Sequence, residues 1–279
     1  MIVVTGATGN VGQPLVRILA AAGEQVTAVS RRPPDVDAPE GVRHRQADLA
    51  DPESLRPAFD GADALFLLIA GSGEDLNPGA ILDAAKSGGV HRIVLLSSQI
   101  TGSRPEAASH ARLRAFEDTV RQSDPAWTIL RPSGFASNAF QWIDPVRSQR
   151  TIAAPFGDIR LPVIDPTDIA EAAAAVLRDG DHAGRTYELT GPEPVSPREQ
   201  AQAIGGALGT PVRFVEQSRA EARAQMLRFM PEPVVDGTLD ILGEPSAAEQ
   251  RVSPTVERIL GRAPRTFADW AVRNIDAFR

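Results

Sequence analysis

Residues 3–16 of this chain are VVTGATGNVGQPLV, in which three glycines follow an apolar run and precede a helical pattern. Glycine in such a turn adopts φ values that a Cβ would oppose, and it lets a phosphate approach the main chain. The N-terminus of the following helix offers free N–H groups to that phosphate. The alternative is a strand–helix turn that binds no nucleotide. The position of the motif favours a dinucleotide-binding turn, whose expected cofactor-binding residues are Gly6, Thr8, Gly9, Asn10, Val11 and Gly12.

Short apolar runs alternate with helical patterns through the first half of the chain. Strands are expected at 2–5, 25–29, 42–46, 64–69, 92–96 and 127–130, and helices at 11–22, 52–59, 78–87 and 107–122. Asp51 and Asn77 each precede a proline and are expected to cap the second and third of these helices. This alternation predicts an α/β fold, a Rossmann-type doubly wound parallel sheet with helices on both faces.

Beyond about residue 131 the pattern loosens into a stretch rich in proline and glycine. A helix is expected at 168–177, a strand at 185–189 and a further helix at 197–208, and the C-terminal part is mainly helical in pattern. We expect a Rossmann domain over residues 1–150, to which part of 163–192 returns. A smaller, mainly helical lobe is expected over 151–279.

Composition excludes several classes of protein. The formal charge of −7 argues against a general nucleic-acid or anionic-membrane surface, because both need clustered Lys and Arg. No apolar stretch approaches the roughly 20 residues that span a bilayer, and the first residues lack a secretory signal, so the cytoplasm is the expected location. With no cysteine and no metal-ligand spacing of histidines, no metal site is expected. A monomer and a homodimer both remain open.

The end of the second expected strand favours NADP(H) over NAD(H). In NAD-preferring domains an acidic residue there accepts hydrogen bonds from the ribose hydroxyls, whereas this strand runs into Ser30, Arg31 and Arg32. A hydroxyl and two guanidinium groups suit a 2′-phosphate, and solvated surface arginines are the alternative. Asp48 and Leu49 are expected near the adenine, although Asp48 is equally a turn residue ahead of a helix.

A polar stripe follows the fifth expected strand. On the helix at 107–122, His110, Arg114, Glu117 and Arg121 fall on one face at 100° per residue. A histidine there could donate a proton near neutral pH, as reduction of a carbonyl requires. A solvated face with charge pairs between successive turns is the alternative, and it is favoured for Glu117 and Arg121.

Several stretches together resemble the NmrA-like, or quinone-oxidoreductase-like, group of atypical short-chain dehydrogenases/reductases. They are TGATGNVG, the SRR after the second strand, LLSS followed by a helix with His where Tyr is expected, TILRPSGFASN and VIDPTDIAEAAAAVL. The likeness extends through LTGPEPVSPREQAQAIGGALGTPVRFV and TFADW, and thus over most of the chain. It implies a Rossmann domain with a C-terminal substrate lobe.

The resemblance also implies candidate catalytic residues. The superfamily uses a serine and then Tyr-x-x-x-Lys on the next helix. Ser97 stands in the place of that serine, but the chain has no Tyr-x-x-x-Lys, and His110 and Arg114 occupy the corresponding positions. Ser97 and His110 are therefore the candidate catalytic residues, with a solvated face equally supported for His110.

By the same resemblance, Arg131 borders the nicotinamide as a further cofactor-binding residue. The implied substrate-binding residues follow it in the sequence and are Phe135, Asn138, Phe140 and Trp142. Packing between the two lobes explains the aromatic residues equally well. If they line a site, a flat, apolar, aromatic small molecule suits them.

The implied activity is NADPH-dependent reduction of a quinone or a polyaromatic ketone. A quinone relaxes the need for a strong acid, because the hydroquinone anion is delocalised, whereas a ketone needs a proton donor. Two alternatives stay open: an NADP(H)-binding redox-sensing regulator that acts through a protein partner, and a non-redox isomerase or cyclase on the same scaffold.

Overall fold

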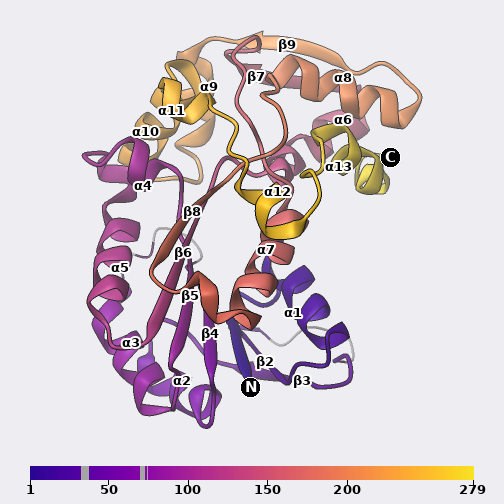
Figure 1. Cartoon of the computed structure of the whole chain (residues 1–279). Coiled ribbons are helices and arrows are strands. Elements are labelled where there is room, and N and C mark those ends of the chain that lie inside the picture. Colours follow the sequence, from indigo (N-terminus) through magenta and orange to yellow (C-terminus); the bar gives the residue numbers. More distant parts are fainter. Residues whose placement is uncertain (33–37, 70–72, 74) are drawn as a thin grey trace. The chain divides into compact units, whose positions relative to one another are not determined.

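The computed structural model describes residues 1–32, 38–69, 73 and 75–279, and its largest feature is a seven-stranded sheet (Figure 1). The strand order is β3-β2-β1-β4-β5-β6-β8, and the pairings from β3 through β6 are parallel. The strands are β1 (Ile2–Thr5), β2 (Val26–Ser30), β3 (Val42–Gln46), β4 (Ala64–Leu68), β5 (Arg92–Leu96), β6 (Ala126–Pro132) and β8 (Arg185–Leu189). The order reverses between β1 and β4, which confirms the Rossmann-type fold class.

Helices cover both faces of this sheet. On one face α1 (Gly12–Ala21) packs beside α7 (Pro166–Arg178), and on the other lie α2 (Pro52–Phe59), α3 (Pro78–Ser87) and α5 (Ala111–Gln122) (Figure 1). The central strands are continuous apolar runs because both of their faces are buried. Strand β3 is different: Arg43, Arg45 and Gln46 are exposed, since this strand forms an edge of the sheet.

The two expected helix caps have different outcomes. Asn77 caps α3, because its side chain accepts a hydrogen bond from the Ala80 N–H at 3.1 Å. Asp51 occupies the cap position of α2 but makes no side-chain cap bond, so that expectation was wrong. Ser54 closes the turn instead: its Oγ donates to the Asp51 carbonyl at 2.6 Å and accepts from the Asp48 N–H at 3.0 Å.

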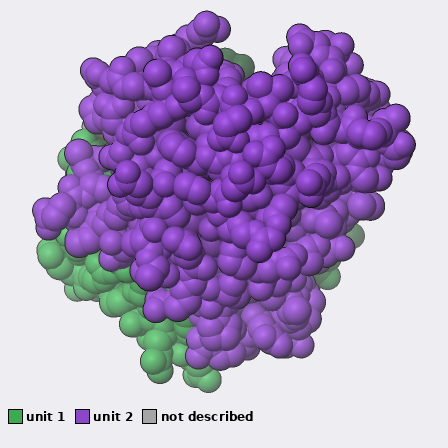
Figure 2. Space-filling view, turned by 90° about the horizontal axis from the view of Figure 1, so that it is seen from above, with its two compact units in different colours: residues 1–101, 110–132, 166–188 green, residues 102–109, 133–165, 189–279 purple. Residues whose placement is uncertain are grey.

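The chain divides into two compact units, which Figure 2 colours separately. Unit 1 comprises residues 1–101, 110–132 and 166–188, and unit 2 comprises 102–109, 133–165 and 189–279. This division differs from the boundary expected at residue 150, because 133–150 belongs to unit 2. In that segment Trp142 and Val146 are buried in one core cluster with Phe267 and Trp270.

Unit 2 contains a second, two-stranded sheet that the sequence pattern did not indicate. Strand β7 (Thr151–Pro155) pairs in parallel with β9 (Arg213–Gln217). The longer helices of this unit are α6 (Ile143–Gln149), α8 (Pro197–Leu208), α9 (Arg219–Met226), α10 (Glu232–Gly243), α12 (Thr255–Leu260) and α13 (Phe267–Arg273). Short helical turns complete the chain: α4 (Ile100–Ser103), η1 (Ala108–His110), η2 (Ala136–Trp142), η3 (Gly180–His182), α11 (Ala247–Gln250) and η4 (Ile275–Phe278). Within the described residues, no helix has the length and apolar character that crossing a membrane requires.

Candidate functional site

The glycine turn between β1 and α1 depends on the missing side chains of Gly6 and Gly12. Gly6 has a φ of +62°, and a Cβ there would lie 2.8 Å from Leu68 Cδ2. A Cβ on Gly12 would lie 2.1 Å from the Gly6 carbonyl oxygen, so only glycine lets the helix start this close to the strand end. The Gly9 N–H donates to the same carbonyl at 3.0 Å. The turn is therefore built for close approach of backbone to backbone.

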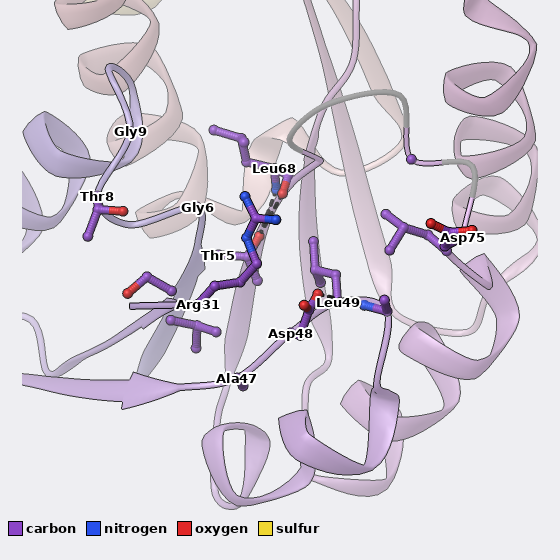
Figure 3. Close-up of a pocket in the computed structure, with 15 residues that line it drawn as sticks. Thr5, Gly6, Thr8, Gly9, Arg31, Ala47, Asp48, Leu49, Leu68 and Asp75 are labelled. Carbon is purple, nitrogen blue, oxygen red and sulfur yellow. Dashed lines mark hydrogen bonds between the residues drawn. The ribbon is translucent and has the colours of Figure 1, made fainter. Parts of the chain in front are cut away.

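The turn borders a pocket of about 470 Å³ that lies within unit 1 (Figure 3). Of the predicted cofactor-binding residues, seven line this pocket: Gly6, Thr8, Gly9, Ser30, Arg31, Asp48 and Leu49. Five do not line it: Asn10, Val11, Gly12, Arg32 and Arg131. The pocket follows the carboxyl ends of β1, β2 and β3, which is where a doubly wound sheet binds its nucleotide.

The pocket also has lining residues that the sequence analysis did not single out. Leu68 ends β4, and Gly73, Asp75 and Leu76 follow that strand. The strand order of a Rossmann-type sheet would have predicted that the residues after β4 line the pocket. Since β4 is the strand beside β1 at the switch point, the chain leaving β4 must pass the mouth of the nucleotide site.

At the end of β2 the three predicted phosphate ligands have different positions. The Ser30 hydroxyl donates to the Arg32 carbonyl at 2.5 Å, so it shapes the turn. Arg31 is exposed and extends into the pocket (Figure 3), whereas Arg32 is exposed and does not line it. Gln46 fixes the turn by donating from Nε2 to the Arg31 carbonyl at 3.2 Å. Of the two arginines, Arg31 is therefore the one whose side chain lies at the pocket.

Asp48 combines the two roles that the sequence left open. Its Oδ1 accepts a hydrogen bond from the Ala50 N–H at 3.0 Å, as a turn residue would. It is also exposed and lines the pocket, with half-buried Leu49 beside it. The turn thus holds one carboxylate oxygen and leaves the side chain at the pocket wall.

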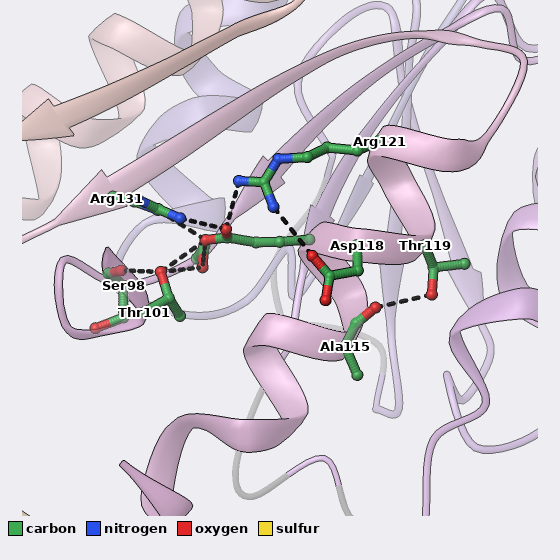
Figure 4. A network of polar contacts seen from close by, with 9 residues as sticks. Ser98, Thr101, Ala115, Asp118, Thr119, Arg121 and Arg131 are labelled. Atoms are coloured by element: carbon green, nitrogen blue, oxygen red, sulfur yellow. Dashed lines mark hydrogen bonds and ion pairs between the residues drawn. The ribbon is translucent and has the colours of Figure 1, made fainter. Parts of the chain in front are cut away.

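The Glu117 carboxylate on α5 accepts five hydrogen bonds, and its partners Thr101, Arg121 and Arg131 are labelled in Figure 4. It accepts hydrogen bonds from the hydroxyls of Ser97 at 2.6 Å and Thr101 at 2.7 Å. Arg131 binds it with two nitrogens at 2.6 and 2.9 Å, and Arg121 binds it at 2.7 Å. The Glu117 side chain is only 1% exposed. The expectation that Glu117 and Arg121 form a solvated face was therefore wrong for Glu117.

These donors keep Glu117 ionised. Burial by itself would raise the pKa of this carboxyl group, but the hydrogen bonds from Arg131, Ser97 and Thr101 and the charge of Arg131 outweigh burial and lower the pKa to about 2. A group with that pKa cannot serve as a proton donor at neutral pH. The same bonds occupy the Ser97 hydroxyl proton and the Nε and Nη2 of Arg131.

His110 is the last residue of η1 and occupies the N-cap position of α5, where its side chain makes no cap hydrogen bond. Burial lowers the pKa of the imidazole, and the charge of Arg114 one turn away lowers it further. The ring is therefore neutral at physiological pH. This weakens the interpretation of His110 as an acid that arrives already protonated.

Two further features bear on proton transfer. The hydroxyl of Tyr187, the one tyrosine in the sequence, lies 2.8 Å from His182 Nδ1. Among the described residues there is no group of three or more His, Asp or Glu side chains that could hold a metal ion.

The predicted substrate-binding residues divide into two kinds. Phe135 is half-buried and Asn138 is exposed. Trp142 is buried in the core of unit 2, and the Phe140 ring packs 5.0 Å from that of Trp270, centroid to centroid. Phe140 and Trp142 thus contribute to packing within one unit, whereas Phe135 and Asn138 remain candidates for contact with a substrate.

Comparisons with known proteins agree with this geometry. A model of the NAD(P)H-binding family matches residues 6–180. The whole chain is 35% identical to the (4-alkanoyl-5-oxo-2,5-dihydrofuran-3-yl)methyl phosphate reductase of Streptomyces griseus and 30% identical to the NAD(P)H azoreductase of Xenophilus azovorans, and covers 99% of each. The structure of the NADPH-dependent quinone oxidoreductase of Escherichia coli with NADPH has a TM-score of 0.82 at 24% identity, over 98% of this chain and 99% of that one.

Substitution of Gly12 by alanine tests the glycine turn. Because the new Cβ would meet backbone at 2.1 Å, we expect Gly12→Ala to weaken NADPH binding at least about tenfold and to lower the melting temperature. Calorimetric titration and thermal unfolding measure both effects. The control is Gly206→Ala on α8, where an added Cβ would have no atom within 4 Å. This variant should raise the free energy of unfolding by about 0.5–1 kcal/mol. Equal NADPH affinity of Gly12→Ala and wild type would contradict this account of the turn.

The lowered pKa of Glu117 predicts a pH-dependent contribution to stability. The contribution is complete above the ordinary glutamate pKa of 4.5 and is lost as the pH falls toward 2. We expect Glu117→Gln to lower the free energy of unfolding at neutral pH by about 3 kcal/mol, because two guanidinium groups lose their counter-charge. Urea denaturation measures the free energy of unfolding of both proteins from pH 7 to pH 3. The difference between the wild type and Glu117→Gln should become smaller as the pH falls.

The matched control is Asp118→Asn, the next residue on α5. Asp118 also pairs with Arg121, at 3.3 Å, but its side chain is 67% exposed. Its replacement should change the unfolding free energy by about 0.5 kcal/mol or less. A Glu117→Gln difference that stays constant across this pH range would refute the assignment of a buried, ionised carboxylate.

Proposed function

The chain belongs to the NAD(P)H-binding family and is an NAD(P)H-dependent oxidoreductase, and we propose that it uses NADPH to reduce conjugated acceptors that delocalise the added negative charge, quinones in particular. Bound NADPH supplies the hydride. The glycine turn would hold the pyrophosphate, and Arg31 would bind the 2′-phosphate at the end of β2.

The observation that carries this proposal is the ionised, fully bonded Glu117. Ser97, which stands in the place of the superfamily's serine, donates its hydroxyl proton to a carboxylate with a pKa of about 2, and the superfamily's tyrosine is replaced by His110. His110 is neutral because burial and Arg114 disfavour its charged form. With no protonated acid among these groups, the acceptor must stabilise the negative charge that hydride addition creates.

Conjugated acceptors meet this requirement. Hydride addition to a quinone gives a hydroquinone monoanion, in which the ring and the second oxygen share the charge. The proton can then arrive from solvent after the hydride has moved. Hydride addition to the carbonyl carbon of a ketone, aromatic or not, would instead leave a localised alkoxide, which is far more basic and needs a positioned donor.

The names of the relatives agree with this acceptor class. In a quinone, in an aromatic azo compound and in a 4-alkanoyl-5-oxo-2,5-dihydrofuran ring, the reducible double bond is conjugated with neighbouring groups. The last of these acceptors also carries a phosphate ester. We therefore include conjugated lactones of this type among the acceptors to be tested.

A panel of acceptors tests the proposal. With NADPH present, 1,4-naphthoquinone and a (4-alkanoyl-5-oxo-2,5-dihydrofuran-3-yl)methyl phosphate (the butenolide phosphate), together with its parent alcohol, should be reduced. The ketones 9-fluorenone and cyclohexanone should react at least about a hundredfold more slowly, the share that a positioned acid contributes. The loss of nicotinamide absorbance measures the rates. Tight NADPH binding without turnover of any acceptor would exclude this function and favour an NADP(H)-sensing regulator. Product formation without NADPH consumption would indicate an isomerase or cyclase.

The cofactor preference predicts the effect of an Arg31 substitution. We expect Arg31→Ala to raise the KM for NADPH about tenfold or more and to leave the KM for NADH nearly unchanged, because only NADPH has a 2′-phosphate. Arg32→Ala is the control, since Arg32 does not line the pocket. If the two variants lose NADPH preference equally, Arg31 is not the specific ligand.

A further inference from the structure

Arg114 on α5 lies outside the ion-pair network of Glu117. Glu117 is bound by Arg121 and Arg131, and Asp118 pairs with Arg121, so two carboxylates neutralise two guanidinium groups. Arg114 lies one turn before Glu117 on the same helix. It takes no part in this network, because the four hydrogen-bonding side chains of Ser97, Thr101, Arg121 and Arg131 already surround the carboxylate.

Arg114 is half-buried, and its Nη1 atom is fully buried without a hydrogen-bond partner in the described part of the chain. An arginine cannot shed its proton to escape this situation. A buried donor that lacks an acceptor costs free energy, and the cost is larger for a charged group. The Nη1 group of Arg114 therefore lowers the stability of the unliganded protein. A ligand that supplies the missing acceptor would remove this cost.

The surroundings of Arg114 suit an anion. The first turn of α5 contains no acidic residue, and the side chain of His110 at its start makes no cap bond. The helix dipole and the Arg114 charge therefore act in the same direction on an anion at this end of the helix.

The position of Arg114 places it at the functional edge of unit 1. Glu117, one turn further along α5, contacts Ser97 and Arg131, which lie at the carboxyl ends of β5 and β6. The start of α5 also reaches the segment that lines the nucleotide pocket: a Cβ on Gly73 would lie 3.2 Å from the Cγ of Arg112. Arg114 therefore belongs to the edge of the sheet at which this fold binds ligands.

We propose that Arg114 forms an anion subsite that binds a phosphomonoester group on the conjugated acceptor. This inference rests on the proposed reductase function, because it assigns the anion to the substrate. A phosphomonoester provides several acceptor oxygens and about two negative charges, which match the fork of a guanidinium and the start of a helix. Arg114 thereby selects the substrate without taking part in hydride transfer.

The test compares the butenolide phosphate with its parent alcohol, which differ only in the phosphate. In the wild type, kcat/KM for the ester should exceed that for the alcohol at least about tenfold. In Arg114→Met, which keeps the length of the side chain, this preference should fall at least about tenfold, mainly through a higher KM for the ester. Arg114→Lys should retain part of it. A smaller fall in Arg114→Met overturns the proposal.

The matched control is Arg56→Ala on α2, which removes the same charge from an exposed residue that pairs with Glu53. Arg56→Ala should keep the wild-type preference for the ester over the alcohol. If this preference falls as far in Arg56→Ala as in Arg114→Met, it reflects the overall charge of the protein and the proposal fails. The NADP⁺ dissociation constant separates substrate from cofactor. If Arg114→Met weakens NADP⁺ binding tenfold and leaves the ester preference intact, Arg114 serves the cofactor and the proposal is overturned.

If no acceptor is reduced, the proposed function is refuted, but the anion subsite at Arg114 can still be tested by two binding measurements. Calorimetry on the NADP⁺-loaded protein should show tighter binding of the ester than of the alcohol in the wild type and no such difference in Arg114→Met. Inorganic phosphate should raise the melting temperature of the wild type more than that of the variant. Equal affinity of ester and alcohol in the wild type would overturn the inference.

Discussion

The Glu117 carboxylate is the interaction on which the architecture of the site depends. A charge with 1% of its side chain exposed is tolerated only when its oxygens are fully bonded. Its donors come from four places in unit 1: the end of β5, the short helix α4, the end of β6 and the next turn of α5 itself. The carboxylate therefore fixes the helix against the strand ends. It also takes up the hydroxyl and guanidinium protons that could otherwise have served in acid catalysis.

Most of the Rossmann unit could be predicted from the sequence because its strands are buried on both faces. Runs such as Ile2–Thr5 and Arg92–Leu96 are recognisable without knowledge of their neighbours, and the glycine turn fixes where the first helix starts. The second sheet could not be predicted in this way. Thr151–Pro155 is short and ends in proline, and it becomes a strand only by pairing with Arg213–Gln217, about sixty residues away.

Site residues could be predicted from the sequence when their residue type has one dominant structural role in such a position. They were harder to predict when the residue type has several roles. The glycine turn and Arg31 were identified because phosphate binding explains both. Glu117 was misassigned because charged helix faces are usually solvated. Its spacing contained the contrary signal: Phe116 precedes it and Val120 follows one turn later, both fully buried, so the helical period places Glu117 beside the apolar stripe.

Each unit is assembled from three separate stretches of the chain, with changes of unit near residues 102, 110, 133, 166 and 189. No single truncation can therefore produce either unit by itself, and an exchange of unit 2 between relatives would require three simultaneous replacements. Synthesis has the same constraint, since unit 2 cannot be completed before the last helix leaves the ribosome. In such a chain, a new substrate specificity has to evolve by substitutions in place rather than by recombination of modules.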